Sequence, residues 1–80
     1  MKLRTFSRRW TVLNYAVTEP DKWTTKAIAE DLDVRFAAIN EARHTLTQKG
    51  LIAKGKQIGR SRAIIPTPAG VDVFNRSLSK

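Results

Sequence analysis

Apolar residues recur at intervals of three and four along the first half of the chain, which is the spacing of one face of an α-helix. The first of these stripes contains Phe6, Trp10, Leu13 and Val17. It predicts a helix over about residues 7–17 with Ser7 as N-cap, and Pro20 ends the element because it disfavours helical geometry in the residue before it. Trp10 lies on the stripe, so we expect it to pack in the core and not to stack on a base.

The same spacing predicts two more helices joined by a tight turn. Thr24 is a suitable N-cap for a short helix over residues 25–32, and Asp33 follows where a tight turn needs a residue that tolerates left-handed backbone geometry. A longer helix is expected over about residues 35–49, and Gly50 ends it. Its inward line consists of Ile39, Ala42 and Leu46. At about 100° per residue, the opposite polar face consists of Ala37, Glu41, His44 and Gln48, with Asn40 on its flank.

The pattern changes after the third helix, where two short β-prone runs replace the helical spacing. A basic segment containing two glycines separates them, so we expect a β-hairpin over about residues 51–66 with a positively charged tip. Thr67 and Pro68 then supply an N-cap and a first-turn proline for a last helix over about residues 68–78. The predicted architecture is one α+β domain over residues 1–80, with three core helices, a two-stranded hairpin and a short final helix.

Positive charge is in excess and unevenly placed. The 80 residues carry 15 Lys and Arg against 7 Asp and Glu, for a formal net charge of +8 at pH 7. Residues 1–18 hold four bases and no acid, residues 19–33 hold two bases and five acids, and residues 34–80 hold nine bases and two acids. Polarised positive charge on a small domain is typical of a protein with a polyanionic partner, and composition alone leaves DNA, RNA and an acidic lipid surface open.

The residue inventory excludes several classes of function. The chain has no Cys and a single His, so it can form neither a disulfide framework nor a structural zinc site. It has no grouping of nucleophile, His and acid and no glycine-rich phosphate loop, so we expect no enzyme activity and no cofactor, metal or small-molecule effector. No apolar run approaches the roughly 20 residues of a membrane span. Ser7-Arg8-Arg9-Trp10 is followed too soon by polar residues to be an export signal, so we expect a cytoplasmic, nucleoid-associated protein with no membrane partner.

Residues 24–52, TTKAIAEDLDVRFAAINEARHTLTQKGLI, resemble the winged helix-turn-helix superfamily. The matching positions are Ala29, Leu32, Val34, Ile39, Ala42, Leu46 and the run Lys49-Gly50-Leu51-Ile52. Residues 65–70, IPTPAG, resemble the strand-to-helix junction that follows the wing in MarR-like regulators. The resemblance implies a winged helix-turn-helix fold, with residues 35–49 as the recognition helix and the hairpin as the wing.

Three residues of the third helix need separate comment. Arg35 stands where the superfamily usually has Ser or Thr, so we expect the start of the recognition helix to lack a side-chain cap. Arg43 stands where a core Leu is usual, and it requires either a carboxylate partner or a stem that extends out of the core. Phe36 lies about 60° from the inward direction, and we expect core packing rather than contact with a thymine methyl group.

Shape and charge together predict a DNA-binding function. A helix about 10–12 Å across fits the B-form major groove, which is about 12 Å wide, whereas the RNA major groove is too narrow for such reading. We therefore expect sequence-specific binding of double-stranded DNA, with the recognition helix in the major groove and the basic wing on the backbone or in the minor groove. The simplest such protein is a small transcriptional regulator that binds two half-sites as a homodimer.

The candidate contacts fall into three groups. Asn40 can pair with adenine through two hydrogen bonds, and Arg60 is the candidate for the minor groove. The recognition-helix candidates are Arg35, Ala37, Asn40, Glu41, His44 and Gln48. The wing candidates are Lys54, Lys56, Arg60, Ser61 and Arg62. The candidates for contact with backbone phosphate are Thr24, Thr25, Lys26, Arg8 and Arg9.

Other functions use the same fold. A protein–protein interaction module in a larger assembly should expose an apolar patch on the outward face of the recognition helix, and the predicted face has none. An accessory DNA-binding protein of chromosome architecture, replication or recombination would have the same sequence features as a regulator. Binding of a left-handed duplex or of structured RNA is disfavoured, because His44 stands where such domains carry Tyr and the expected wing prolines are missing.

Overall fold

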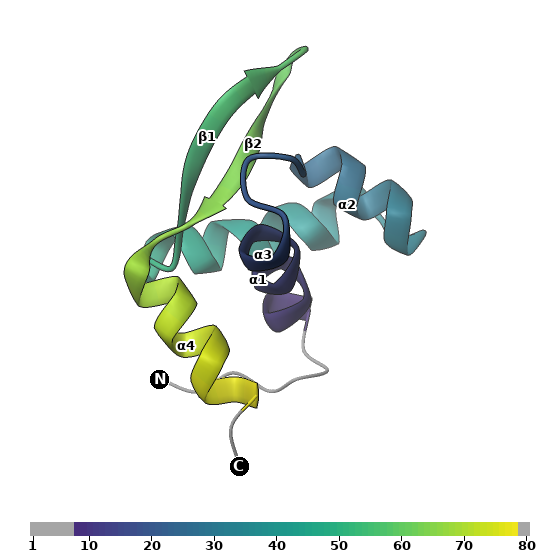
Figure 1. The fold of residues 1–80 in the computed structure, drawn as a ribbon. Coiled ribbons are helices and arrows are strands. Elements are labelled where there is room, and N and C mark those ends of the chain that lie inside the picture. Colours follow the sequence, from purple (N-terminus) through teal and green to yellow (C-terminus); the bar gives the residue numbers. More distant parts are fainter. Residues whose placement is uncertain (1–7, 79–80) are drawn as a thin grey trace.

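The computed structural model describes residues 8–78. Its elements, in chain order, are α1 (Arg8–Thr18), α2 (Thr25–Leu32), α3 (Phe36–Gln48), β1 (Ile52–Ile58), β2 (Ser61–Pro66) and α4 (Pro68–Leu78). The helices pack together, the β1–β2 hairpin extends from one end of them, and α4 runs toward the opposite end (Figure 1). This arrangement confirms the predicted α+β class, and we call the hairpin the wing.

The proposed N-cap Ser7 and the stripe residue Phe6 lie outside the described residues. None of the described helices is long and apolar enough to span a membrane.

The core forms where the apolar stripes of the helices meet the base of the wing. The predicted inward line of α3 is confirmed, since Ile39 and Leu46 are fully buried and Ala42 is 5% exposed. Trp10 packs against the core as predicted, and its ring stacks on Phe74 of α4 with the ring centroids 5.5 Å apart. The buried apolar cluster consists of Val12, Leu13, Ala16, Ile28, Ala29, Ile39, Ala42, Leu46, Leu51, Ile52, Ile64, Val73 and Phe74.

Local backbone chemistry sets where α2 and α3 begin and end. The Thr24 hydroxyl oxygen accepts a hydrogen bond at 3.1 Å from a backbone N–H of the first turn of α2, which is the predicted N-cap. Asp33 has φ 55° and ψ 48°, so the expected left-handed conformation in the tight turn is confirmed. α3 ends in a Schellman motif, in which Gly50 has φ 72° and the Leu51 N–H donates to the Leu46 carbonyl at 3.0 Å. These stops fix the direction of α3 relative to α2 and the point at which the wing begins.

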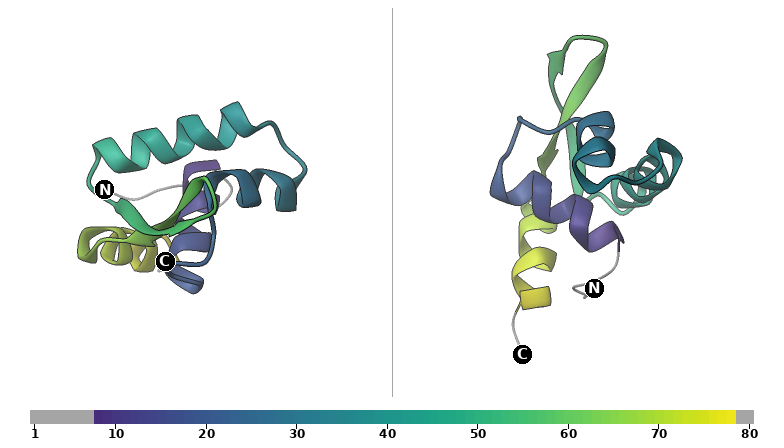
Figure 2. Two further views of the ribbon diagram at one scale, coloured as in Figure 1. Left: turned by 90° about the horizontal axis from the view of Figure 1, so that it is seen from above. Right: turned by 90° about the vertical axis from the view of Figure 1, so that its right-hand side faces the viewer.

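The wing is an antiparallel hairpin with one irregularity. Its tip is a two-residue turn in which Gly59 has φ 60°. Between the Lys54 and Gln57 pairs, β1 has one more residue than β2, which is a β-bulge at residues 55–56. The right-hand view of Figure 2 shows the wing rising clear of the helices beyond its base. The paired residues are Ile52 and Pro66, Ala53 and Ile65, Lys54 and Ile64, Gln57 and Arg62, and Ile58 and Ser61.

The connection between α1 and α2 runs along the free edge of β2. The Ile64 N–H donates to the Trp23 carbonyl at 2.9 Å, and the Asp21 N–H donates to the Ile64 carbonyl at 3.3 Å. An isolated bridge also joins Thr24 to Ala63. The sequence pattern does not predict this pairing, because a Pro beside acidic residues is typical of a loop. The pairing attaches the base of the wing to the helices.

Candidate nucleic-acid interface

α3 exposes a polar face on the side away from the core. Ala37, Glu41, His44 and Gln48 are all exposed, because they lie opposite the buried line of the helix. Arg35 is also exposed, and it makes no side-chain hydrogen bond at the helix start, as the sequence predicts. The 13 residues of α3 therefore present a free face that a nucleic-acid groove can accommodate.

A groove of about 300 Å³ separates α3 from the wing. On its helix side lie Phe36, Asn40, Arg43 and Thr47, which follow one another at helical spacing. The wing side includes Lys54, Ser61 and Arg62. The lining thus contains three cations and no Asp or Glu. Such a lining is electrostatically suited to a ligand that carries phosphate.

Asn40 and Arg43 form a hydrogen-bonded pair in this groove. The Arg43 guanidinium donates to Asn40 Oδ1 from Nε at 3.2 Å and from Nη2 at 3.1 Å. The acceptor is therefore an amide oxygen, and the carboxylate that we considered for Arg43 is not its hydrogen-bond partner here. Because both N–H groups donate to the same oxygen, Oδ1 of this groove-lining residue is occupied, and Nδ2 is the part of the amide that can still donate to a ligand. A two-bond contact with adenine also requires Oδ1 as an acceptor, so in this arrangement Asn40 is better suited to donate to a base than to accept from one.

Phe36 does not pack in the core, and that expectation was wrong. Its side chain is 53% exposed. Phe36 lies on the side of α3 that faces the wing, and the groove separates the two elements there. Its side chain therefore lines the groove and does not enter the core. The sequence alone does not reveal this gap, because it depends on how far the hairpin lies from the helix.

The wing carries four exposed basic residues, Lys54, Lys56, Arg60 and Arg62. The Arg62 Nε donates to Gln57 Oε1 at 3.4 Å, which is at the long end of the hydrogen-bond range, and Ser61 is half-buried. Ile58 is 38% exposed at the end of β1 beside the turn, a feature that the sequence reasoning missed because the segment reads simply as basic. Its pairing with Ser61 places it on the same face of the hairpin as that groove-lining residue.

Asp21 holds the wing by its backbone. Its carboxylate Oδ1 accepts a hydrogen bond from the Lys56 N–H at 2.6 Å, at the bulge in β1. Asp21 itself has φ 63°, a left-handed conformation that Asp tolerates better than most residues. Gly55 lies directly against this carboxylate, and a Cβ at that position would collide with it and lie 2.9 Å from Ile65 Cγ2. The bulge, the glycine and the acid thus form one fixed junction between the α1–α2 connection and the wing.

Replacing Asp21 with Gly should therefore loosen the wing without unfolding the helices. Gly adopts the left-handed conformation freely, so the change removes only the acceptor. The cost of ordering the freed hairpin on binding should weaken affinity for duplex DNA about tenfold, although the variant loses a negative charge. Hydrogen exchange of the Lys56 amide should accelerate at the same time.

Asp21→Asn is the matched control: it keeps an acceptor and loses the same charge, so it should bind at least as tightly as the unmodified chain. Equal affinity for both variants would show that Asp21 does not position the wing.

The candidates for phosphate contact lie at two other points. Lys26 is exposed, and Thr25 lines the groove. Thr24 is only 7% exposed and its hydroxyl oxygen already caps α2, so it holds the start of that helix and does not face a ligand. The exposed Arg8-Arg9 pair lines a second hollow of about 290 Å³ on the other flank of α3, next to Glu41. The two hollows flank α3 on both sides.

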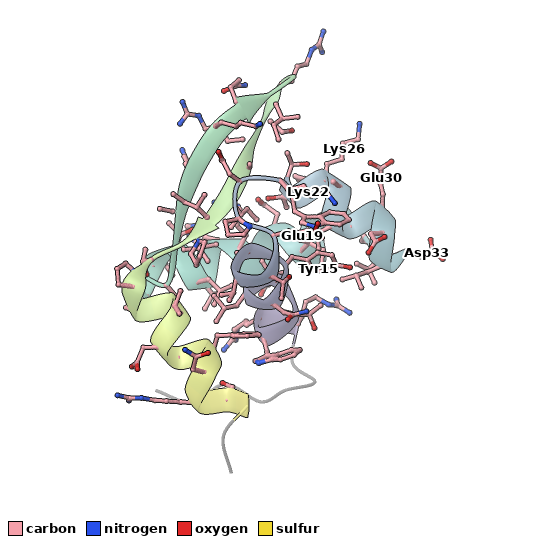
Figure 3. All side chains as sticks on the ribbon, viewed as in Figure 1. Tyr15, Glu19, Lys22, Lys26, Glu30 and Asp33 are labelled. Carbon is pink, nitrogen blue, oxygen red and sulfur yellow. The ribbon has the colours of Figure 1, made fainter. Side chains whose placement is uncertain are left out.

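Five of the seven acidic residues lie on α2, in the connection before it or in the turn after it, where Figure 3 labels Glu19, Glu30 and Asp33; the other two lie on α3 and α4, and none of the seven lines the groove. The Tyr15 hydroxyl donates to Asp31, and burial together with this hydrogen bond and the negative charge raises the pKa of Tyr15 to about 12. Hydrogen bonds from Lys22 at 2.7 Å and from Trp23 at 2.9 Å lower the pKa of Glu19. Within residues 8–78, no three His, Cys, Asp or Glu side chains are grouped so that they could hold a metal ion.

Comparison with known proteins identifies the fold. No family model and no curated protein matches the sequence. Among solved structures, MepR, a transcription regulator of the Staphylococcus aureus multidrug efflux pump MepA, superposes with a TM-score of 0.80 at 22% identity over 91% of this chain and 55% of that chain. A MarR-family transcriptional regulator from Rhodococcus has a TM-score of 0.80 at 18% identity over 90% of this chain and 51% of that chain. The transcriptional regulator BldR from Sulfolobus solfataricus has a TM-score of 0.75 at 24% identity over 88% of this chain and 50% of that chain.

The TM-scores of 0.75–0.80 establish a shared fold. The chain spans about half the length of the solved regulators that it matches. The matched part contains the helices and the hairpin described above, since it covers about nine-tenths of this chain. The chain therefore has the winged helix-turn-helix fold that is found in transcription regulators of the MarR family.

Proposed function

We propose that this chain binds double-stranded DNA in a sequence-specific manner as part of a transcriptional regulator, and that it acts by binding and not by catalysis. The observation that carries the proposal is the groove between α3 and the wing, whose lining has three cations and no acid. It lies beside a helix with an exposed polar face. The similar solved structures are of transcription regulators, which supports the same role here.

In the proposed complex, α3 enters the major groove and the wing follows the adjacent backbone or enters the minor groove. The sugar–phosphate ridge between the two DNA grooves then lies in the cationic groove, next to Arg43, Lys54 and Arg62. Ala37, Glu41, His44 and Gln48 face base edges or phosphates, and Arg35 reaches them from the helix start. Lys56, Arg60, Ser61, Thr25 and Lys26 lie along the backbone, and Arg8 and Arg9 reach a phosphate on the far flank of α3.

The Asn40–Arg43 pair assigns a distinct chemistry to the middle of α3. With Oδ1 held by Arg43, Asn40 donates from Nδ2. The matching acceptors in the major groove are purine N7, guanine O6 and thymine O4. We therefore propose that Asn40 reads one of these acceptors, and that Arg43 keeps its amide in the required orientation.

Binding as a homodimer to two half-sites would give such a small module useful specificity, because a single module has a footprint of only about 600–1,000 Å². We propose this mode of binding, with no small-molecule effector and with action on the nucleoid in the cytoplasm. The fold similarity to transcription regulators supports a regulatory role on DNA.

Selection from a pool of randomised duplexes at moderate salt tests the proposal. We expect a defined motif to be enriched, with two copies of the chain sedimenting on it and half-sites about 10–10.5 base pairs apart. Asn40→Ala should weaken binding to the enriched site by about 1–3 kcal/mol and relax one base position.

Asn75→Ala is the matched control, because Asn75 is an exposed residue of α4 and lies outside the proposed interface. It should leave affinity and motif unchanged. Uniform binding of all duplexes without enrichment would point to an architectural protein, and a folded chain that binds no duplex would contradict the proposal.

A further inference from the structure

Among the side chains that the structure describes, those of residues 8–77, two large hydrophobic ones are exposed, and both belong to the elements that face the groove. They are Phe36 at the start of α3 and Ile58 beside the tip of the wing. Phe36 is the more exposed of the two, at 53%, and it forms part of the groove wall. Single exposed apolar side chains are common on protein surfaces, so the exposure of Phe36 gains weight only from its place in the wall of a cationic groove at the start of α3.

The surroundings of Phe36 define the chemistry of that ligand. The two aromatic pairs of the described structure are Trp10 with Phe74 and Tyr15 with Trp23, so Phe36 is in neither. Across the groove stand Lys54 and Arg62, and Arg43 lies on the same flank of α3. A ligand suited to this groove carries negative charge for Arg43, Lys54 and Arg62, and it has a small apolar group near that charge for the Phe36 ring.

Duplex DNA supplies that combination at one base. In the major groove the base edges present hydrogen-bond donors and acceptors, and the thymine C5-methyl is the apolar group among them. Residues at the N-terminal end of a recognition helix are those that reach base edges. We propose that the Phe36 ring contacts a thymine 5-methyl group at the mouth of the groove and so specifies one T·A pair in the target. The inference rests on the proposed function, sequence-specific DNA binding, and names one base that the chain reads.

The charge of the groove favours DNA over a protein as the occupant. A lining with three cations and no acid attracts a polyanion, whereas an apolar protein patch would bring no negative charge to balance these cations. One exposed ring is also much smaller than the apolar surfaces that mark protein docking sites.

Single replacement of thymine by deoxyuridine tests the inference, because it removes only the methyl group and keeps every hydrogen bond. In the selected duplex, we expect replacement at one thymine to weaken binding of the unmodified chain about fourfold, the loss associated with one buried methyl-sized group. Phe36→Ala should weaken binding to the thymine duplex by a similar factor and should bind the thymine and uracil duplexes equally. Phe36→Leu, which keeps an apolar contact, should retain part of the difference.

Ile58→Ala is the matched control, since it removes the other exposed large apolar side chain; it should keep the full difference between thymine and uracil. Circular dichroism and thermal melting of the Phe36 variants check that the fold is intact, as expected for an exposed residue.

The outcomes separate the two proposals. A selected motif in which every uracil replacement changes affinity less than twofold overturns the role of Phe36 and leaves sequence-specific DNA binding standing. The same holds if the thymine preference persists in Phe36→Ala. If no duplex is bound or selected, the proposed function fails and the role of Phe36 fails with it.

Discussion

Raising the monovalent salt concentration from about 50 to about 200 mM should weaken binding of this chain to its preferred duplex about a thousandfold. The expectation follows from the exposed basic residues on the wing and at both ends of the proposed interface. Neutralising about six phosphates releases their counterions and gives a slope near −5 in a plot of log affinity against log salt. Fluorescence anisotropy at a series of salt concentrations measures this slope directly.

Two variants show whether the slope comes from the proposed surface. Arg60→Ala, at the tip of the wing, should make the slope shallower by about 1 and weaken all duplexes alike. Arg76→Ala is the matched control. Arg76 forms an ion pair with Asp72 at 3.1 Å on α4, which runs toward the end of the molecule opposite the wing (Figure 1). This substitution removes the same charge and should leave the slope unchanged. A flat salt titration, or equal effects of the two variants, would contradict the proposed interface.

Gly70→Ala should destabilise the fold by about 3 kcal/mol, although Ala is the better helix former. Gly70 is buried in the first turn of α4, and a Cβ there would collide with the Leu51 carbonyl oxygen and lie 2.9 Å from its carbonyl carbon. That carbonyl is fixed, because it accepts the Thr67 N–H at 3.0 Å and because the Leu51 N–H is bonded to Leu46. The melting temperature should fall by more than about 12 °C in thermal denaturation.

Ala69→Gly separates the collision from helix propensity. Ala69 is exposed in the same turn of α4, so its replacement costs only the propensity difference, about 1 kcal/mol. If Gly70→Ala proved no more harmful than Ala69→Gly, the close approach of α4 to the end of α3 would not be tight in solution.

The parts of the fold that depend on local chemistry were predictable from the sequence. The spacing of Ile39, Ala42 and Leu46 fixed which side of α3 is buried, since helical geometry relates position to direction directly. The left-handed backbone of Asp33 was also predictable, because a helix that ends in a tight turn commonly has one left-handed residue directly after its last turn. The hairpin followed from two β-prone runs around a basic, glycine-containing segment.

What escaped prediction depends on distances between elements that are remote in sequence. Phe36 faces the groove because the wing stands off from α3, and no local pattern encodes that separation. Asp21 reaches the Lys56 backbone across 35 positions of sequence. The Arg43 contact is the exception, because its guanidinium donates to the Asn40 amide three residues earlier on the same helix, whereas the superfamily pattern indicated the core or a carboxylate. The Phe36 and Asp21 cases are tertiary features set by a neighbouring element, and the Asn40–Arg43 hydrogen bond is local to α3.

The extra residue in β1 has a consequence for comparing this chain with others. The bulge takes up this residue locally: Lys54 and Gln57 pair with Ile64 and Arg62, which lie on the same face of β2, so the tip side chains keep their faces with or without it. An alignment that places the gap away from the bulge instead shifts β1 by one position, and successive side chains of a strand lie on opposite faces. Identical letters in the same column of an alignment can then lie on opposite sides of two wings. The gap of one residue therefore belongs at residues 55–56, and a contact inferred for Arg60 transfers to a homologue only after superposition of the backbones.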